Sequence, residues 1–299
     1  MSRAVSPSTG KRYGLALVCR VWKSARATVY WRRHHGVRPS SSTARRGPNG
    51  PCPDAELLEH IQAVLSASPF CGEGYRKVWV RLRAQGIRTS KRRVLRLMRE
   101  HALLAPQRVG RPRGPKNHEG TITTDDVNEM WGTDLTSTIT AEEGQACIFV
   151  AVDHCSSECV GIHASRSGNR FEALEPIRQG VREYFGAFDQ DAASGLALRH
   201  DHGSQYTSRD FQGELAFLGM ESSPSFVRAP EGNGCAERFI RTLKENLLWV
   251  RTFPTIEDLR LALLEFKRVY NETWILGRHG YKTPAQVRAE QLNPLVIAA

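Results

Sequence analysis

The sequence predicts a mixed α/β domain in its second part, preceded by an all-helical region that binds a polyanion. Three observations support this prediction. The second part contains apolar segments with the composition of β-strands, followed by helical segments. The first part contains the pattern of a helix-turn-helix. The charge is also divided, because residues 1–120 hold 25 Lys and Arg against six Asp and Glu, whereas residues 121–299 hold 17 against 25. A basic region followed by a carboxylate-rich one indicates separate roles for the two parts.

Two segments rich in Pro, Gly and Arg divide the chain of 299 residues, at 36–53 and 106–120. They contain little that can be buried, so we interpret them as linkers, and the second can also lie along phosphates. The predicted regions are a basic helical segment with its linker (1–50), a helix-turn-helix region with its linker (51–120) and the α/β domain (121–299).

The elements before the α/β domain are predicted to be helices. Residues 13–34 have the pattern of two short helices with a turn near 23–25, and residues 54–68 carry an apolar stripe at helical spacing, with Asp54 as the expected N-cap. Residues 74–101 predict two helices joined by a turn, although alternation in the first leaves a strand as an alternative there. Ser90 is the expected cap of the second helix.

The second helix of this motif has one apolar and one basic face. Its predicted inward residues are Val94, Leu95, Leu97 and Met98. Its predicted outward residues are Lys91, Arg92, Arg93, Arg96 and Arg99. A solvated charged face is the alternative, but five bases balanced only by Glu100 favour DNA contact.

The α/β domain begins with three strands that short turns join into an antiparallel meander. These strands are predicted at 129–140, 145–156 and 159–165, and a helix follows at 170–186. A further short strand, 195–201, ends in Asp201. The helix at 207–219 is capped by Thr207 or Ser208 and stopped by Gly219, another helix starts near Asn233, and the last long helix spans 255–272.

Three acids in this domain occupy positions that are notable for a charged side chain. Asp134 lies within the first strand and Asp201 ends a later one, although acids are disfavoured in strands. Glu237 lies on the helix that starts near Asn233, whereas the competing acid Glu231 lies in the preceding turn. The alternatives are exposed edge or turn positions for the two aspartates and a simple i,i+4 pair with Arg241 for Glu237.

The helix that carries Glu237 is predicted to bury residues 239, 240, 243 and 247. Glu237, Arg241 and Lys244 then share one polar face beside that stripe. Carboxylates held together favour hard cations, and two such ions can promote in-line attack on a phosphodiester. Arg241 and Lys244 would contact the DNA phosphates.

The cysteines and the apolar segments exclude other classes of protein. Seven cysteines without a CxxC pair disfavour a disulfide framework, and His154, Cys155 and Cys159 lack the second ligand pair of a zinc site. No apolar run approaches the roughly 20 residues that span a bilayer. We therefore expect a soluble cytoplasmic protein without membrane association.

Three motifs in order resemble the signatures of DDE transposases and retroviral-type integrases. They are "WGTDLT" (131–136), "HDHGSQYTS" (200–208) and "GNGCAERFIRTLKENLL" (232–248), with 35 residues between Asp201 and Glu237 and a Lys seven residues after that Glu. The helix-turn-helix segment resembles that of the second reading-frame product (OrfB) of the insertion sequence three family. The resemblance covers about 54–290, including "YKTPAQV" (281–287).

The resemblance implies an RNase H-like catalytic core, a mixed five-stranded sheet flanked by helices, in which Asp134, Asp201 and Glu237 bind two Mg²⁺ (or Mn²⁺) ions and catalyse the reaction. It implies DNA cleavage and strand transfer at the terminal repeats of an insertion sequence, with target DNA as the second substrate. Implied partners are further copies of the chain on DNA and an upstream-frame (OrfA) product, at the bacterial nucleoid. Asp153 matches an acid without catalytic duty.

The sequence departs from the family's pattern at two places, and other functions stay open. His202 replaces the more usual Arg or Asn, and the third motif lacks the common tripeptide before its helix. A His–His–Cys–Cys zinc module, typical of retroviral integrases, is also missing from the sequence. The alternatives are a catalytically inert, element-derived DNA-binding protein and a nonspecific RNase H-like nuclease.

Overall fold

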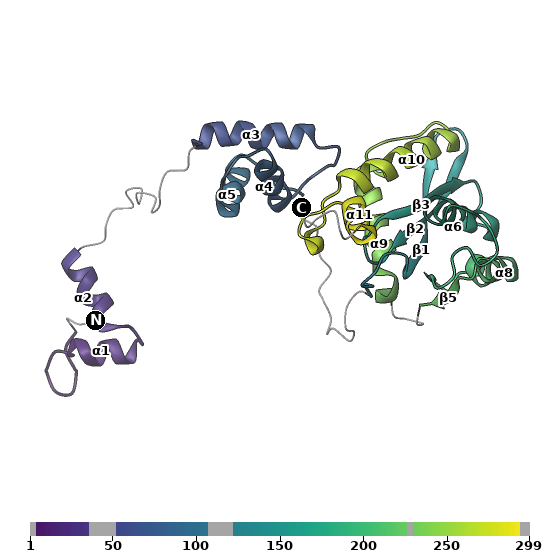
Figure 1. Ribbon diagram of the computed structural model, residues 1–299. Coiled ribbons are helices and arrows are strands. Elements are labelled where there is room, and N and C mark those ends of the chain that lie inside the picture. The colour runs from purple at the N-terminus through teal and green to yellow at the C-terminus, as the bar shows by residue number, and fades with distance from the viewer. Residues whose placement is uncertain (1–3, 36–51, 107–121, 226–229, 294–299) are drawn as a thin grey trace. The chain divides into compact units, whose positions relative to one another are not determined.

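The computed structural model describes residues 4–35, 52–106, 122–225 and 230–293 (Figure 1). The chain forms two compact units, residues 1–49 and 50–299. The predicted region boundaries after residues 50 and 120 and most of both predicted linkers lie outside the described residues, so this division stays a prediction.

The first unit contains two short helices, as predicted. Helix α1 spans Leu15–Val21 and helix α2 spans Arg26–His35. Between them Lys23 adopts a left-handed conformation with φ of 47°, which separates the two helices where the turn was expected.

The second unit begins with three packed helices, α3 (Asp54–Ala67), α4 (Tyr75–Ala84) and α5 (Lys91–Glu100). The helix-turn-helix is confirmed, and α4 removes the strand alternative. Ser90 caps α5 by accepting a hydrogen bond from the Arg93 amide. The shared core consists of Leu57, Ile61, Val64, Val78, Leu82, Val94, Leu97 and Met98.

Asp54 does not cap α3 as expected. Pro53 occupies the N-cap position, and Asp54 is the first residue of the helix. Its carboxylate instead accepts hydrogen bonds from Arg93 and Arg96 of α5, each at 2.7 Å. The sequence pattern at a helix start does not distinguish these roles, because a carboxylate there is favoured in either position.

The α/β part contains the mixed five-stranded sheet. Its strands are β1 (Met130–Thr140), β2 (Gly144–Asp153), β3 (Cys159–Ser165), β4 (Ala197–His200) and β5 (Glu221–Pro224). The spatial order is β3-β2-β1-β4-β5. The first three strands form the predicted antiparallel meander, and β4 and β5 run parallel to β1. The fold class is confirmed.

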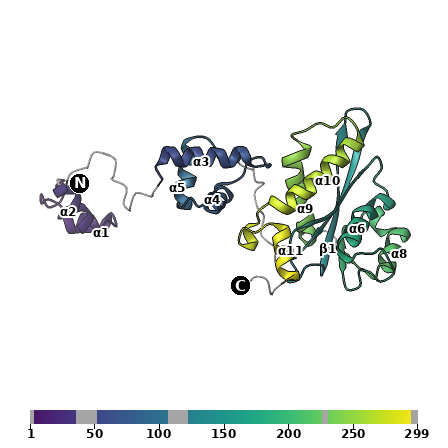
Figure 2. The same cartoon turned by 45° about the horizontal axis from the view of Figure 1, so that its top comes forward.

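Helices cover both faces of this sheet (Figure 2). Helices α9 (Gly234–Leu243) and α10 (Ile256–Thr273) lie on one face, and α6 (Arg170–Phe185) and α8 (Arg209–Phe217) lie on the other. Successive β2 residues point to opposite faces, so Ile148 packs under the first pair of helices and Phe149 under the second. The α/β part therefore has two hydrophobic cores separated by one sheet.

Helix α6 approaches the sheet closely because glycine faces it. A Cβ atom added at Gly161 of β3 would lie 1.8 Å from the carbonyl oxygen of Pro176. Pro176 is itself inside α6, whose cap is Asn169. Any side chain at residue 161 would therefore push the helix away from the sheet.

The chain between α8 and α10 departs from the expected helix. A 3-10 turn, η1 (Pro230–Asn233), precedes α9, and a π-helical turn, η2 (Lys244–Leu248), follows it. The wider turn moves the apolar stripe by one residue, so Leu248 is buried where Leu247 was predicted. Phe239, Ile240 and Leu243 are buried as predicted.

The last described helix, α11 (Pro284–Leu292), starts at the capping box of Thr283 and Gln286. The remaining short helices are α7 (Ser204–Thr207) and η3 (Gly277–His279). Among the described residues, no helix combines the length and apolar character that a membrane crossing requires.

Candidate active site

Strand pairing brings Asp134 and Asp201 to the same level of the sheet. In the parallel pair of β1 and β4, Gly132 lies opposite Arg199. The same register, continued by two residues, sets Asp134 beside Asp201, which directly follows β4. Neighbouring strands lie about 4.8 Å apart. The two aspartates therefore stand on adjacent strands at one edge of the parallel pairing.

The loop after β4 holds Asp201 by its backbone and its side chain. The Asp201 carboxylate accepts a hydrogen bond from the Gly203 amide at 2.8 Å. The preceding His200 ring lies 2.6 Å from the Asp201 carbonyl oxygen and 2.9 Å from the Ser222 hydroxyl of β5. This turn fixes the direction in which the exposed Asp201 side chain leaves the sheet.

Asn233 joins the helix that carries Glu237 to the strand that carries Asp134. Asn233 is buried at the start of α9, and its amide nitrogen donates to the Thr133 carbonyl at 2.9 Å. A Cβ atom added at Gly132 would lie 2.6 Å from the Asn233 amide oxygen. Close approach at this glycine therefore seats the first turn of α9, with Glu237 in it, against β1.

The charges of Asp201 and Glu237 act on the carboxyl group of Asp134. The pKa of the Asp134 carboxyl group is raised to about 6, chiefly by burial and also by the charges of Asp201 and Glu237. A hydrogen bond from the Leu135 amide, 2.8 Å from the carboxylate, and the charge of Lys244 oppose the rise. The three acids therefore lie near enough for their charges to interact, although their carboxylate oxygens are not among the groups that come within 4.8 Å of one another in the described part of the chain.

This donor set fits hard divalent cations. Three carboxylates offer only oxygen ligands, which Mg²⁺ and Mn²⁺ prefer. Like charges that raise the pKa of Asp134 are tolerated when a cation lies among them, since the ion stabilises the ionised form of each.

Tyr206 is a residue near the site that the sequence did not single out. It is fully buried, and its ring packs edge-on against Phe211. Burial raises the pKa of its hydroxyl, and the nearby charges of Asp134 and Asp201 raise it further, so the group stays protonated. Its only sequence signal is its position five residues after Asp201.

The two predicted DNA-contacting residues on the Glu237 helix differ in their surroundings. Arg241 donates to Glu245 at 2.9 Å, in the i,i+4 direction away from Glu237. Lys244 lies at the start of the π-helical turn, close enough for its charge to lower the pKa of Asp134. Lys244 therefore shares the electrostatic environment of the triad.

The predicted DNA-contacting residues of α5 divide into two groups. Lys91 and Arg92 are exposed, and the Lys91 ammonium lies 4.4 Å from the centre of the Trp79 ring. Arg93 and Arg96 instead point toward Asp54 of α3. The sequence pattern missed this pairing because Asp54 lies about forty residues away.

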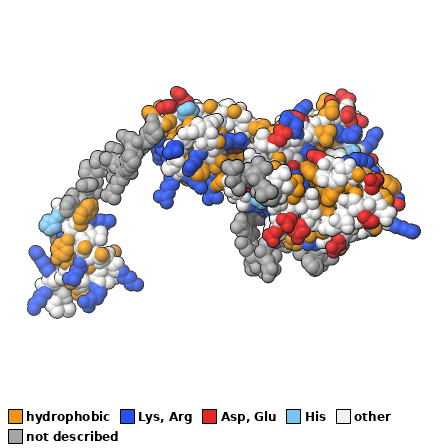
Figure 3. All heavy atoms as spheres, viewed as in Figure 1, with side chains coloured by type: hydrophobic (Ala, Val, Ile, Leu, Met, Phe, Trp, Pro, Cys, Tyr) orange, Lys and Arg blue, Asp and Glu red, His pale blue; other side chains and the backbone are white. Residues whose placement is uncertain are grey.

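Exposed bases still gather on the helix-turn-helix. Figure 3 shows Lys and Arg side chains along the surface of the α3–α5 helices, with Asp and Glu more frequent on the α/β part. The exposed basic residues here are Arg76, Arg83, Arg88, Lys91, Arg92 and Arg99.

The acid and the His/Cys group that the sequence leaves outside the site have other roles in the structure. Asp153 is buried and accepts hydrogen bonds from the Asn128 amide and from the amide and hydroxyl of Ser156. His154, Cys155 and Cys159 do not converge as a metal-binding group in the described part of the chain. Burial lowers the pKa of His154 to about 4, so its ring is neutral.

Two kinds of domain model match the chain. Integrase core domain models match residues 125–230 and 218–284, and an HTH-like domain model matches residues 53–111. The first two matches together contain Asp134, Asp201 and Glu237, and the third contains α3, α4 and α5.

Relatives come from insertion elements of Escherichia coli. The chain is 26% identical over 280 residues to transposase InsD for insertion element IS2A/D/F/H/I/K, covering 92% of this chain and 90% of the relative. It is also 26% identical over 289 residues to an uncharacterized 48.2 kDa protein of insertion element IS2A, covering 95% of this chain and 66% of that protein.

Solved structures with similarity to the chain are retroviral integrases. The catalytic core of BIV integrase matches with a TM-score of 0.41 and 21% identity, over 56% of this chain and 97% of that one. A simian T-cell lymphotropic virus intasome in complex with PP2A regulatory subunit B56 gamma matches with a TM-score of 0.46 and 18% identity, over 79% and 74% of the two chains.

Proposed function

We propose that the chain, which matches integrase core and HTH-like domain models and resembles transposase InsD, cleaves DNA at the ends of an insertion element and transfers those ends to target DNA. The observation that supports this proposal is that Asp201 and Glu237, from two other elements, lie near enough to Asp134 for their charges to raise its pKa.

In this proposal the three carboxylates hold two Mg²⁺ ions, with Mn²⁺ as a substitute. When bound, such ions activate an attacking oxygen and stabilise the leaving oxygen of a phosphodiester. The first reaction is hydrolysis, in which water attacks phosphorus and frees a 3′-OH. The second is transesterification, in which that 3′-OH attacks a phosphodiester of target DNA and another 3′-oxygen leaves.

The protein's own residues orient these groups. Asn233 holds the Glu237 helix against β1, and the Gly203 amide orients the Asp201 carboxylate. Lys244, whose charge acts on Asp134, is positioned to contact a phosphate beside the reacting bond. Arg241 contacts a phosphate farther along the same helix face once DNA competes with Glu245 for its guanidinium.

The helix-turn-helix binds the terminal repeats in this proposal. The exposed bases of α5, Lys91 and Arg92, contact DNA directly, because a basic second helix is the element that enters the major groove in such motifs. Synapsis of two element ends requires further copies of the chain, and an upstream-frame (OrfA) product is a second proposed partner. In this proposal, DNA cleavage and strand transfer take place at the nucleoid, in the bacterial cytoplasm.

The test is a cleavage and joining assay with DNA that carries the element's ends and Mg²⁺. We expect Glu237→Gln to abolish both reactions while leaving end binding intact, because the amide cannot ligate a cation as the carboxylate does. Glu142→Gln, at an exposed acid of the β1–β2 turn, is the matched control and should retain activity. Equal activity of the Glu237→Gln variant and the unchanged protein would refute the triad.

The same assay separates two other functions. An inert, element-derived DNA-binding protein binds ends with no dependence on metal and cleaves nothing. A nonspecific RNase H-like nuclease degrades nucleic acid with no preference for element ends. Cleavage limited to the element ends, dependent on metal and on Glu237, supports the transposase over both.

A further inference from the structure

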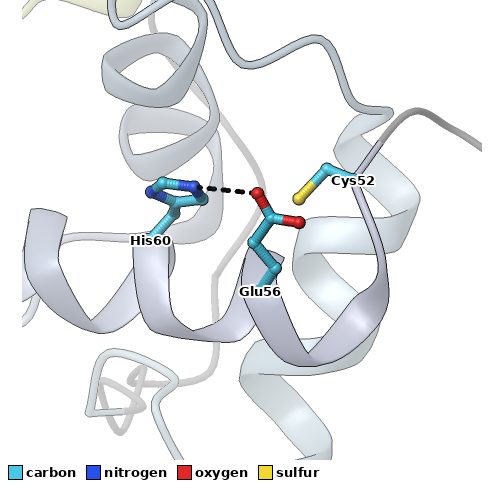
Figure 4. A group of neighbouring side chains, drawn as sticks. All are labelled: Cys52, Glu56 and His60. Atoms are coloured by element: carbon cyan, nitrogen blue, oxygen red, sulfur yellow. Dashed lines mark ion pairs between the residues drawn. The ribbon is translucent and has the colours of Figure 1, made fainter.

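A second cluster of metal-binding side chains lies outside the triad, at the start of α3. Cys52, Glu56 and His60 follow one another at intervals of four residues, so they lie on one side of the helix and its N-terminal extension. Figure 4 shows their side chains turned toward one another, with the Glu56 carboxylate between the thiol and the imidazole. Their potential ligand atoms all lie within 4.8 Å of one another.

These three atoms form a ligand set that selects a particular kind of metal. Sulfur, imidazole nitrogen and carboxylate oxygen are the ligands of Zn²⁺ in proteins, with bonds of about 2.0–2.3 Å, so two atoms sharing one tetrahedral ion lie about 3.4 Å apart. We propose that Cys52, Glu56 and His60 bind one Zn²⁺ ion, with water in the fourth position. Only small side-chain movements are needed, since His60 and Glu56 already approach to 3.8 Å.

The metal-free contacts of the cluster are ones that zinc would replace. The His60 ring pairs with Glu56, and the Cys52 thiol donates to the Pro53 carbonyl at 3.5 Å. Zinc binds the thiolate form of cysteine, so the Cys52 thiol must lose its proton when the ion binds. Binding releases that proton to solvent, and one thiolate and one carboxylate then balance the two charges of the ion.

The site is joined directly to the DNA-binding helix. Arg93 of α5 donates one hydrogen bond to the Cys52 carbonyl at 2.7 Å and another to the neighbouring Asp54 at 2.7 Å. A metal that fixes Cys52 against α3 therefore also fixes the acceptor of an Arg93 contact. The expected consequence is a more stable packing of α3 on α5, the helix with the exposed bases.

The two proposed metal sites have different ligand atoms, so they should select different metal ions. The triad has only oxygen ligands and suits Mg²⁺, whereas a thiolate and an imidazole select Zn²⁺ or Co²⁺ over Mg²⁺. Excess Mg²⁺ should therefore fill the triad without displacing an ion from Cys52, and each site can be studied in the presence of the other.

The experiment is titration of the full-length, reduced protein with Co²⁺ in excess Mg²⁺, followed by the sulfur-to-cobalt charge-transfer absorption. We expect one equivalent to produce this band and Zn²⁺ to remove it by displacement. Cys52→Ser should abolish the band, whereas Cys71→Ser, at an exposed cysteine outside the cluster, should leave it unchanged. A band that survives in Cys52→Ser, or no band in the unchanged protein, overturns the proposal.

The other two ligands are tested by affinity. Loss of an outer partner of a metal ligand already costs about 10–100-fold in affinity, so Glu56→Gln and His60→Ala should each weaken Co²⁺ binding by at least that much. Glu59→Gln, at an exposed acid of the same helix, should bind Co²⁺ like the unchanged protein. Affinity in His60→Ala equal to that of the unchanged protein contradicts the site.

The result is independent of the proposed transposase activity. Asp134→Asn, which disrupts the triad, should keep the cobalt band at full intensity. Zn²⁺ should also raise the Tm of this variant, and it should leave the Tm of the double variant Asp134→Asn with Cys52→Ser unchanged. A zinc-dependent rise in Tm that persists in the double variant would assign the stabilisation to another place and reject the proposal.

Discussion

At the scale of single residues, Asp134 links metal binding to pH. Its carboxyl group has a pKa of about 6, chiefly because it is buried, against an ordinary value of 3.8. The metal binds only the ionised form. Below pH 6 a cation must therefore displace a proton, and above it the carboxylate is ready to bind.

We predict that the affinity of the protein for Mg²⁺ rises as the pH increases from about 5 to 7 and then levels off, because Asp134 ionises in that interval. Calorimetric titration at several pH values, in buffers of different ionisation enthalpy, measures the affinity and the proton released. A flat affinity over this interval, with no proton release below pH 6, would contradict the assignment.

The same residue makes the metal-free protein less stable at neutral pH. The raised pKa favours the protonated carboxyl group in the folded state. Its contribution to the free energy of unfolding is therefore complete below pH 3.8 and is lost as the pH rises through 6. We expect Asp134→Asn to stabilise the metal-free protein at pH 7, by up to about 3 kcal/mol. Urea unfolding in EDTA tests this, with Glu142→Gln as a control that should change little.

Asn233 is predicted to position the site without touching DNA. Asn233→Ala removes its hydrogen bond to the Thr133 carbonyl and loosens the turn that seats Glu237. Because a misplacement of about 1 Å can cost about 100-fold in rate, we expect a 10- to 100-fold slower single-turnover cleavage. The Kd for end DNA should stay the same.

The matched control for this prediction is another asparagine at the start of a helix. Asn169 caps α6, and its own contacts are with residues of that segment. Asn169→Ala should cleave at the unchanged rate once both variants are shown to be folded by circular dichroism. Equal rates for the Asn233→Ala and Asn169→Ala variants would remove Asn233 from the site.

The sequence predicted the positions of the three acids better than it predicted the residues that hold them. Asp134, Asp201 and Glu237 stand out because each lies where its local pattern disfavours or isolates an acid. Asn233 acts through a partner far away in the chain, Thr133, a hundred residues before it. Local periodicity contains no information about such contacts.

At the scale of elements, α5 combines exposed and paired arginines. Arg92 and Arg99 are exposed and stand seven residues apart, on one face of the helix. Arg93 and Arg96 hold Asp54 at the start of α3. The first pair is thus available to phosphates, and the second pair supports the packing of the helix-turn-helix.

We predict that the double variant Arg92→Ala with Arg99→Ala has a shallower plot of log K for end binding against log salt concentration. The slope should fall by about one for each DNA phosphate that the variant no longer neutralises. Arg93→Ala with Arg96→Ala should lower the Tm and leave that slope unchanged, because it deprives Asp54 of its partners. Fluorescence anisotropy at several salt concentrations gives the slopes. The reverse pattern would assign DNA binding to Arg93 and Arg96.

The elements that the sequence missed have weak local patterns. Strand β5 contains Glu, two Ser and Pro, none of which favours a strand, and it forms by parallel pairing with β4. The first three strands were predicted because their apolar residues are long continuous or alternating runs. Tertiary pairing thus determines β5 where local preference does not.

At the scale of the molecule, Arg288 ties the last described helix to the sheet. It is buried and ion-paired with Glu158 in the turn between β2 and β3, and it donates to Asn128 before β1 at 2.9 Å. Its guanidinium also lies 4.0 Å from the centre of the Tyr184 ring of α6. One side chain therefore connects α11 with three separate parts of the α/β domain.

We predict that Arg288→Met destabilises the protein by about 3–5 kcal/mol, because the buried carboxylate of Glu158 loses its ion-pair partner. Adding Glu158→Gln should restore part of that stability. Arg268→Met, which removes an exposed pair on α10, is the control and should change little. Urea unfolding measures all three, and an unchanged midpoint for Arg288→Met would disprove the role of this ion pair.

The π-helical turn after α9 has a consequence for how relatives are compared. A π-helical turn contains one residue more than an α-helical turn, so it accommodates an extra residue without breaking the helix. Relatives that lack it should show a one-residue gap between Leu243 and Trp249 when their chains are aligned with this one. Deleting one residue between Leu243 and Leu247 should convert this turn into an α-helical one, in which Leu248 lies four positions after Leu243 and stays buried, and Trp249 stays exposed. A comparison that considers substitutions alone would therefore misalign every residue that follows this turn.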